Sequence, residues 1–514
     1  MMHLPYLSLL IWQGIIAAGL ILWLGDQKIA WVKGVTYSSI GLSVLLTILL
    51  WIGFDPKLKM QFIESMSWMA NPSVDGALGG MPAIRYHLGV DGISFPMVWL
   101  TVLTNVLLML FSEHLIDEHP SQYRAIFLLM QSMTLGIFCA LDGILFYVFW
   151  EGVLIPMYLC IGIWGSQQRA YAAIKFFIYT FIGSAMMLIA LIYLGLAAKT
   201  YDILAWVTLP LSFQEQLWLF IAFLLAFAIK VPMVPVHTWL PDAHTEAPAG
   251  GSVILAALML KVGAYGFFRF NLPILPDASQ WMSPIMIALS LIAIVYIGLV
   301  ALAQTDMKRL IAYSSVAHMG FVTLGLFAIY NIANASADLS VVQLSLEGAL
   351  VQMIAHAFGS GAMFLAFWLI YNQLHTRKIA NMGGIGQSMP YFTAFFVLFA
   401  FSNVALPGTT GFVGEIMVIL SVFRANAAIA TIAALTTILS ACYTLWMVKR
   451  VFYGPITNDA VATLTDINGK EQCVLFALAV TILLLGFYPN LLLNWMHPSV
   501  SQLATLALKH KVII

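Results

Sequence analysis

The chain has 514 residues, of which 62% are hydrophobic and only 9% are charged, whereas a soluble domain carries about 25% charged residues. Its 22 Lys and Arg balance its 22 Asp and Glu, so the net charge favours neither nucleic acid nor an acidic partner. The 4 cysteines are widely spaced without a CxxC pair, which argues against a disulfide framework, a zinc site and an iron–sulfur cluster. We therefore interpret the chain as a polytopic membrane protein.

Long apolar stretches recur along the whole chain. The first, 4–24, is too long for the core of a signal peptide and follows no Lys or Arg, so we expect it to remain as a helix. A second, 37–54, precedes the longest polar interval, 55–89, where Asn71-Pro72 and Gly79-Gly80 allow a short hairpin. Further spans are predicted at 93–111, 124–141, 144–164, 171–197, 217–236, 252–270, 281–303, 310–330, 348–371, 391–423, 427–448 and 473–493. The pattern predicts an all-α polytopic fold with about 14 transmembrane helices.

Loop charges indicate how these helices are oriented. If the loop at 25–33 faces inside and the following loops alternate, the inside loops carry more Lys and Arg than the outside loops, where Arg269 is expected. The positive-inside rule then places both termini outside. With no cleavable signal, a bacterial inner membrane is the expected location, and an organelle-encoded relative stays open.

Ionisable residues inside the predicted spans are the main functional signal. No reasonable shift of the boundaries moves Glu151, Lys230, Lys261 or Glu415 into a loop. Four unpaired charges in hydrocarbon would cost roughly 10 to 14 kcal/mol, about the net stability of a whole domain. These groups must be paired, hydrated or neutral. Static ion pairs that join helices are one interpretation, but we favour a path for charge, because buried pairs stabilise less than apolar packing does.

The first charged span is broken by prolines. Lys230 is followed by Pro232 and Pro235, which lack the N–H groups that would bond the carbonyls of Ala228 and Val231. We therefore expect free backbone acceptors beside the ammonium.

A second break precedes Glu415. Pro407 and three nearby glycines interrupt the span five helices later. Two broken, charged helices in corresponding positions are typical of transporters with inverted repeats, although no residue-level repeat is visible.

Histidines have two interpretations each. His318 and His356 lie in or near spans and could relay protons, because imidazole changes charge near neutral pH, or they could simply pack between helices. A metal site is not expected, because Pro241 and Pro248 prevent one helical face from gathering the potential ligands His237, Asp242, His244 and Glu246.

Other charges lie near predicted helix ends. Lys175 either reaches the inside surface or joins the buried groups. Lys308 and Arg309 are predicted to form an interfacial anchor that pairs with Asp306. Glu113 ends a predicted helix at the start of a solvated loop that also holds His114, Asp117, Glu118 and His119.

Motifs for redox chemistry are missing from the sequence. No G-x-G-x-x-G follows a strand, and no phosphate loop or pattern of haem or iron–sulfur ligation is present. We expect the chain to move charge without carrying electrons.

Four stretches resemble one known family. They are FYVFWEGVLIPMYLCIGIWG from Phe146, KVPMVPVHTWLPDAHTEAPAGGSVILAALMLKVGAYG from Lys230, QTDMKRLIAYSSVAHMG from Gln304 and LPGTTGFVGE from Leu406. They resemble the antiporter-like subunits of the proton-pumping NADH:quinone oxidoreductase, respiratory complex I. The resemblance covers nearly the whole chain. At position 415 the chain resembles the M type (chain 4 type), because it has glutamate there. The L and N types, and the related D type of multisubunit sodium/proton antiporters, usually have lysine at this position.

The resemblance implies a fold and a set of roles. It implies two inverted five-helix units at 123–270 and 281–451, flanked by 1–111 and 473–514. Glu151 matches the key glutamate, Lys230 its lysine partner, Lys261 the central relay lysine and Glu415 the terminal glutamate. His318 and His356 match assisting positions. No cofactor or metal is expected on this chain, because NADH, FMN, iron–sulfur clusters and quinone are implied in partner subunits.

The expected partners are other membrane subunits, including antiporter-like neighbours, together with the lipid bilayer and protons, and no nucleic acid. We expect a proton to pass from Lys230 through Lys261, with water and His318, to Glu415. Three alternatives stay open. The chain could be a D-type component of a multisubunit sodium/proton antiporter, a passive structural subunit, or a membrane metalloenzyme that uses the segment 237–246.

Overall fold

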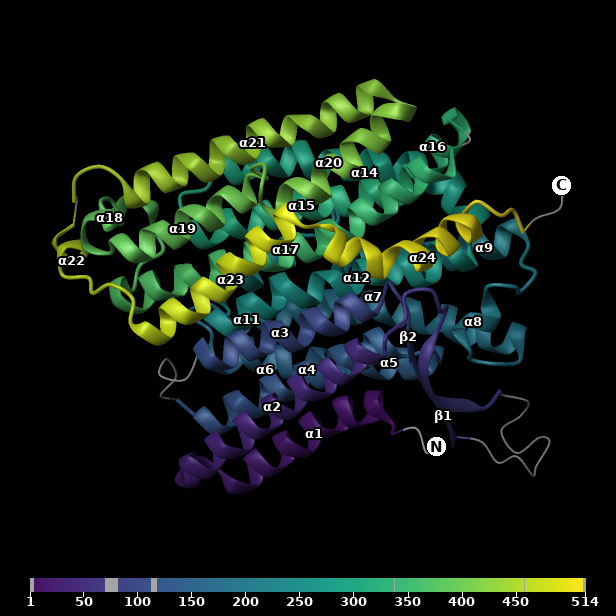
Figure 1. The fold of residues 1–514 in the computed structure, drawn as a ribbon, viewed down its shortest axis with the longest axis horizontal. Coiled ribbons are helices and arrows are strands. Elements are labelled where there is room, and N and C mark those ends of the chain that lie inside the picture. Colours follow the sequence, from purple (N-terminus) through teal and green to yellow (C-terminus); the bar gives the residue numbers. More distant parts are fainter. Residues whose placement is uncertain (1–3, 70–81, 112–117, 337, 457, 512–514) are drawn as a thin grey trace.

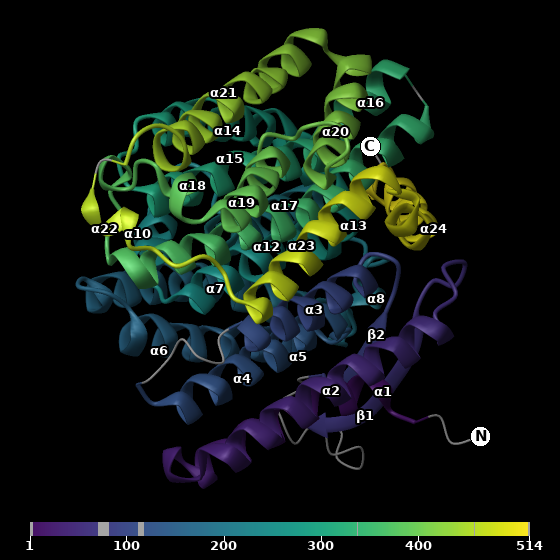
Figure 2. The ribbon, with the colours of Figure 1, turned by 60° about the vertical axis from the view of Figure 1, so that its left-hand side comes forward.

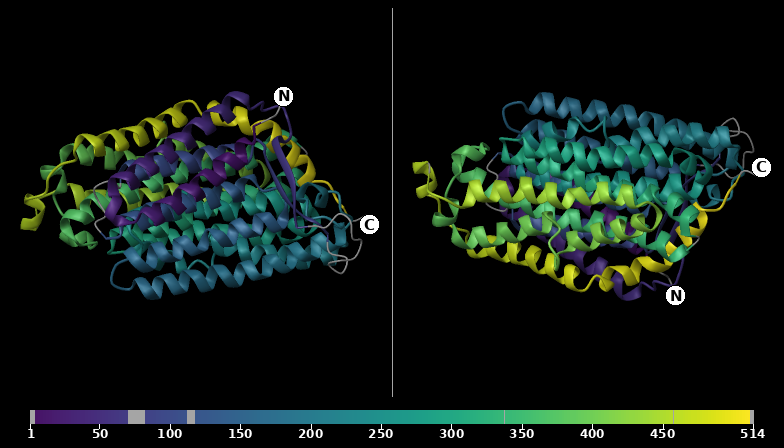
Figure 3. Two further views of the ribbon diagram at one scale, coloured as in Figure 1. Left: turned by 90° about the horizontal axis from the view of Figure 1, so that it is seen from below. Right: turned by 90° about the horizontal axis from the view of Figure 1, so that it is seen from above.

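Long helices dominate the structure, a computed structural model that describes residues 4–69, 82–111, 118–336, 338–456 and 458–511. The helices run roughly along one direction, which is close to horizontal in Figure 1, and the same alignment is visible from below and from above in Figure 3. In the described residues, 11 helical stretches are long and apolar enough to cross a membrane. The chain is a multi-pass membrane protein.

The helices coincide with the predicted spans. Single long helices are α1 (Tyr6–Leu24), α2 (Ile29–Gly53), α3 (Phe95–Phe111), α4 (Pro120–Cys139), α7 (Arg169–Ala198), α14 (Pro276–Leu302), α15 (Met307–Phe327), α17 (Leu339–Leu374), α21 (Ala427–Phe452) and α23 (Gly469–Phe487). One further crossing is made by α5 (Gly143–Gly152) with α6 (Leu154–Trp164). Another combines α11 (Ala249–Ile254), α12 (Leu260–Gly266) and α13 (Leu272–Ile274) with π-helical turns at Leu255–Met259 and Phe267–Asn271. The predicted fold class is confirmed.

Two crossings are interrupted as predicted. The first is α9 (Phe213–Lys230), followed after a turn by α10 (Trp239–Glu246), and the second is α19 (Pro390–Asn403), followed by α20 (Thr410–Ala425). Four crossings lie between them, so the two broken helices run in opposite directions through the bundle. Short helices between the crossings are α8 (Ile203–Trp206), α16 (Ile329–Ser336), α18 (Ile385–Ser388) and α22 (Asp459–Ala462). The longer α24 (Asn490–Ala507) follows the last crossing.

A β-hairpin lies in the predicted polar interval. Strand β1 (Gln61–Met69) pairs antiparallel with β2 (Ile84–Val90), with Met66 opposite Tyr86. Its predicted turn signals, Asn71-Pro72 and Gly79-Gly80, lie outside the described residues. The hairpin stabilises the first turn of α1, because the Glu64 carboxylate accepts from the backbone N–H groups of Leu7 (2.8 Å) and Ser8 (3.0 Å).

Burial identifies the centre of the bundle. The stretch Ala249–Ile274 is buried on all sides, and α15 and α17 are almost as enclosed, whereas α7, α14 and α21 each expose an apolar face. Figure 2 shows α1 and α2 at one end of the molecule and α20 and α21 at the other. A polar side chain on α12, α15 or α17 is therefore shielded from lipid by a layer of other helices.

Asp142 caps the N-terminus of α5. Its carboxylate accepts from the N–H groups of Ile144 (2.9 Å), Leu145 (3.0 Å) and Arg85 (3.0 Å). Burial raises the pKa of Asp142 from 3.8 to about 6, although these three N–H groups lower it, and the charge of Asp202 raises it further. Ionised Asp142 at neutral pH therefore destabilises the fold.

The Asp142→Asn substitution is expected to stabilise the protein at about pH 7.5 by about 1 to 2 kcal/mol. Asparagine keeps the cap through its carbonyl oxygen, loses the acceptor for the Arg85 N–H, and removes the charge. The folded pKa lies above the unfolded value, so the protonated carboxyl favours folding. This contribution is complete below pH 3.8 and is lost as the pH rises through about 6. Thermal unfolding of the detergent-solubilised protein checks this, and a gain that did not shrink at acidic pH would contradict it.

Candidate functional site

Lys230 ends α9 at the first break, and its side chain is only 1% exposed. Among the described residues its Nζ has no hydrogen-bond partner, and it lies 5.0 Å from the centre of the Trp150 ring, a cation–π contact. Glu151 follows Trp150 on α5 and interacts electrostatically with Lys230 without a direct hydrogen bond. The carboxylate also contacts the Tyr147 hydroxyl. The Lys230 side chain is thus buried, with the carboxylate of Glu151 near it but not bonded to it.

The prediction of a free carbonyl at the break is wrong for Ala228. Its oxygen accepts from the N–H of Met233 at 2.7 Å, one residue further along than in an α-helix, because Pro232 cannot donate. The next carbonyl, of Ile229, accepts from the Trp239 indole N–H at 2.8 Å. Donors from the turn and from α10 thus compensate for the proline, and neither carbonyl solvates the ammonium.

Lys261 lies on α12 with no exposed surface. Its Nζ donates to the carbonyl of Ala256 at 2.5 Å and lies 2.5 Å from His356 Nδ1. Ala256 belongs to the π-helical turn that precedes α12, and such turns recur at functional sites. A charged Lys261 donates to His356, whereas a neutral amine can accept from it, so a proton can shift along this contact.

Gly263 allows α12 to pack closely against the broken helix. A Cβ at this position would lie 2.7 Å from Lys230 Cβ and 3.0 Å from Val231 N. Lys230 and Lys261 are therefore carried by helices in direct contact, and the contact at Gly263 lies two residues after Lys261 on α12.

The Gly263→Ala substitution is expected to destabilise the protein by about 1 to 3 kcal/mol, because the added methyl group overpacks this contact. A matched control is Gly41→Ala on α2, where an added Cβ meets nothing within 4 Å. Thermal unfolding of both variants in detergent checks this. Equal stability of the two variants would contradict it.

The second group of buried residues joins α15, α17 and α20. His318 Nδ1 lies 2.8 Å from Glu415 Oε1, and Gln352 Nε2 donates to the same oxygen at 3.1 Å. The ring centres of His318 and His356 are 6.0 Å apart. All four side chains are almost completely buried. From Lys261 to Glu415 the spacing thus leaves one gap, between the two imidazoles.

A small cavity lies at this gap. Both histidines, Glu415, Ser402 and Asn403 line it, and it offers about 10 Å³ to the centre of a water molecule, enough for roughly one. In the described part of the chain, His318 Nε2, His356 Nε2 and Glu415 Oε2 have no hydrogen-bond partner. Such buried polar atoms normally bind water, so a bridging water fits here.

His244 on α10 joins this set although sequence reasoning considered it only as a metal ligand. Its ring stacks on Phe364 with centres 4.5 Å apart, and neither ring nitrogen has a partner among the described residues. It interacts electrostatically with Lys261 and Lys308, and also with His356. Only its place in a broken, polar motif could have signalled this, because its neighbours lie far away in sequence.

The four potential metal ligands diverge. Asp242 pairs with Lys175 Nζ at 2.7 Å and with Arg309 at 3.2 Å, whereas Glu246 accepts from Ser166 Oγ at 2.5 Å. No group of three or more His, Cys, Asp or Glu suited to a metal occurs in the described ranges. Lys175 is 20% exposed and partly buried in its pair with Asp242. Glu113 lies outside the described residues.

Two predicted locations of basic residues are wrong. Lys308 is no interfacial anchor: it is buried, and its Nζ donates to the carbonyl of Ala247 at 2.6 Å, because α10 folds back over the start of α15. Asp306 instead caps α15 through the N–H groups of Lys308 and Arg309. Arg269, expected at the outside surface, is buried in a bidentate pair with Asp91 at 2.8 and 2.9 Å.

Comparisons with known proteins agree with this geometry. Residues 140–440 match the family described as NADH:quinone oxidoreductase/Mrp antiporter, TM. Subunit M of the NADH-quinone oxidoreductase of Rhodobacter capsulatus is 44% identical over 487 residues, 92% of this chain and 90% of the relative. The chain belongs to this family. The predicted resemblance, including the M type, is confirmed.

Another relative and two solved structures extend the match. Chain 4 of the NADH-ubiquinone oxidoreductase of Marchantia polymorpha is 38% identical over 97% of this chain and 96% of its own. A chain of respiratory complex I from Thermus thermophilus has a TM-score of 0.85 at 28% identity, covering 98% of this chain and 100% of that one. A chain of the Mrp complex from Dietzia sp. DQ12-45-1b has a TM-score of 0.84 at 19% identity over 99% and 100%, which shows a shared fold.

Proposed function

We propose that this chain is a proton-translocating membrane subunit of an NADH:quinone oxidoreductase in a bacterial inner membrane. The relatives that carry this name are similar over nearly their whole length. We assign the proton path to seven residues, called the relay residues: Glu151, Lys230, His244, Lys261, His318, His356 and Glu415. Electron transfer would take place in partner subunits that hold NADH, FMN, iron–sulfur clusters and quinone, with no redox centre on this chain.

One observation carries the proposal. From Lys261 to Glu415, titratable groups follow one another at 2.5 Å, 6.0 Å between ring centres and 2.8 Å, and the wider gap borders a cavity that fits a water. Helix packing alone does not require such a series, because burying polar groups costs energy that apolar side chains avoid. The series supports a proton path near the middle of the membrane.

Electrostatic control would come from the first broken helix. An ionised Glu151 stabilises the ammonium of Lys230, which has no other charged partner in the described residues. When Glu151 is neutralised or drawn away, the ammonium loses that stabilisation in a medium of low dielectric constant and releases its proton. The proton would continue through Lys261, the histidines and Glu415. Each proton moved against ~100 mV requires ~2.3 kcal/mol.

The proposed organisation follows the two breaks. We assign five-helix units to 123–270 and 281–451, with α9 and α10 in the first and α19 and α20 in the second, flanked by 1–111 and 473–514. The apolar faces of α7 and α21 are available to lipid or to other membrane subunits, including antiporter-like neighbours.

A sodium/proton antiporter component is the second candidate, supported by the shared fold alone. The deciding experiment uses inside-out membrane vesicles from cells with and without this gene. We expect gene-dependent acidification of the vesicle lumen on NADH addition, unaffected by removal of sodium. Gene-dependent proton exchange driven by a sodium gradient, with no response to NADH, would instead favour the antiporter.

A further inference from the structure

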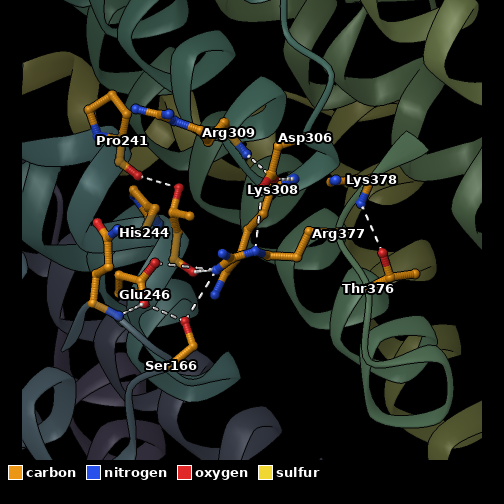
Figure 4. Close-up of polar contacts among 12 residues, drawn as sticks. Ser166, Pro241, His244, Glu246, Asp306, Lys308, Arg309, Thr376, Arg377 and Lys378 are labelled. Carbon is orange, nitrogen blue, oxygen red and sulfur yellow. Dashed lines mark hydrogen bonds and ion pairs between the residues drawn. The ribbon is translucent and has the colours of Figure 1, made fainter. Parts of the chain in front are cut away.

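The C-terminal end of α10 is held by cations from other segments (Figure 4). Arg377, in the loop after α17, donates from NH1 to the carbonyl of Thr245 at 2.6 Å, and Lys308 on α15 donates to that of Ala247 at 2.6 Å. The last carbonyls of a helix have no partner within it and carry partial negative charge, so these contacts are favourable. The half-helix that bears His244 is thus fixed from outside its own unit.

Arg377 also reaches the start of α15. Its Nε lies 3.3 Å from Asp306 Oδ2, while NH1 lies 3.2 Å from Ser166 Oγ and 3.5 Å from Glu246 Oε1. Asp306 uses its other oxygen to cap α15. Figure 4 shows the guanidinium between Glu246 and Asp306. One side chain therefore contacts both the end of α10 and the beginning of α15.

Backbone contacts fix the position of this arginine. Its carbonyl accepts from Met307 N–H at 3.0 Å, and the N–H of Ile379 bonds the carbonyl of Thr305 at 3.0 Å. The loop after α17 is thus paired with the loop before α15. Relative motion of α10 and α15 would have to break the guanidinium contacts first.

We infer that Arg377 is a positioning residue for proton transfer, which holds His244 on α10 at a set distance from His318 on α15 and His356 on α17. The inference rests on the proposed function. Arginine suits this task because its planar fork bonds several acceptors at once, whereas the single ammonium of lysine cannot bridge a carboxylate and a distant carbonyl in the same way. The two proposed units would then be aligned through one side chain, at the end of α10 and the start of α15.

The test compares Arg377→Gln and Arg377→Lys in the assembled complex in inside-out vesicles. The measured quantity is protons taken up per NADH oxidised. We expect the ratio to fall roughly threefold to tenfold for Arg377→Gln, within the range found for residues that couple sites, and less for Arg377→Lys. The control is Arg169→Gln. Arg169 lines, together with Arg377, a cavity of about 470 Å³, and its NH1 donates to the carbonyl of Ile163. The ratio of this variant should equal that of wild type.

Asp306→Asn provides a second measurement, because asparagine keeps the cap on α15 and loses the charge that faces Arg377. If both residues act through one contact, the double variant should have the same ratio of protons to NADH as the single variant with the lower ratio. Additive losses in the double variant would overturn the inference. The inference would also be overturned if assembled Arg377→Gln had the wild-type ratio of protons to NADH. If the glutamine variant fails to assemble, a wild-type ratio in Arg377→Lys would overturn it. Wild-type vesicles that did not acidify with NADH would refute the proposed function itself.

Discussion

Replacing Glu151 with glutamine is expected to reduce NADH-driven proton uptake by about 10²-fold, with NADH oxidation falling in parallel and the complex still assembling. Glutamine keeps the size of the side chain and removes the only charge in the described residues that balances Lys230. Without it, the ammonium cannot be stabilised and released in turn. The measurement follows NADH oxidation and lumen acidification together in inside-out vesicles, with assembly checked by native electrophoresis.

Glu215→Gln is the matched control. Glu215 lies in the first turn of α9, at the opposite end from Lys230, where it forms a capping box with Ser212. Glutamine also serves in such a box, so pumping should be unchanged. Wild-type pumping in assembled Glu151→Gln would remove this glutamate from the path. Loss of sodium-driven proton exchange alone would indicate an antiporter.

Substituting Lys230 with methionine is expected to abolish pumping while leaving the protein at least as stable as wild type. The ammonium is buried without a hydrogen-bond partner in the described residues, so its removal relieves a desolvation cost. Methionine fills a similar volume. Static ion pairs would give the reverse result, in which assembly fails and each assembled complex still turns over at the normal rate.

Thermal unfolding and pumping per assembled complex are the two measurements for Lys230→Met. Lys449→Met serves as control, because Lys449 is an exposed lysine in the last turn of α21. Its pumping should stay at the wild-type level. Normal pumping in Lys230→Met would refute the mechanism proposed for the first broken helix.

Local sequence patterns predicted most of the fold. Helix positions followed from apolar length, and both breaks followed from prolines placed beside a charge, since neither signal depends on the rest of the chain. The second helix nevertheless begins at Ile29, and α17 begins at Leu339, because polar residues near the ends of a span are tolerated where other helices or water meet them. Hydropathy marks the centre of a span better than its ends.

The candidate site was only partly predictable. Glu151, Lys230, Lys261 and Glu415 stood out because a charge within a long apolar run is rare. His244 and Lys308 did not, because their burial depends on α10 folding back against α15 and α17, a tertiary contact with no local pattern. The same contact explains why the predicted surface anchor at Lys308 was wrong.

The enclosure of Ala249–Ile274 sets apart two kinds of position in this chain. Outward side chains of α7, such as Phe181 and Ile182, are buried over only about half of their surface, so fewer neighbours restrict which apolar residues fit there. Each side chain around Lys261 must instead match several fixed neighbours at once, which ties its identity to theirs. Over evolutionary time the outer helices can thus drift residue by residue, whereas the central helix can change only together with its neighbours.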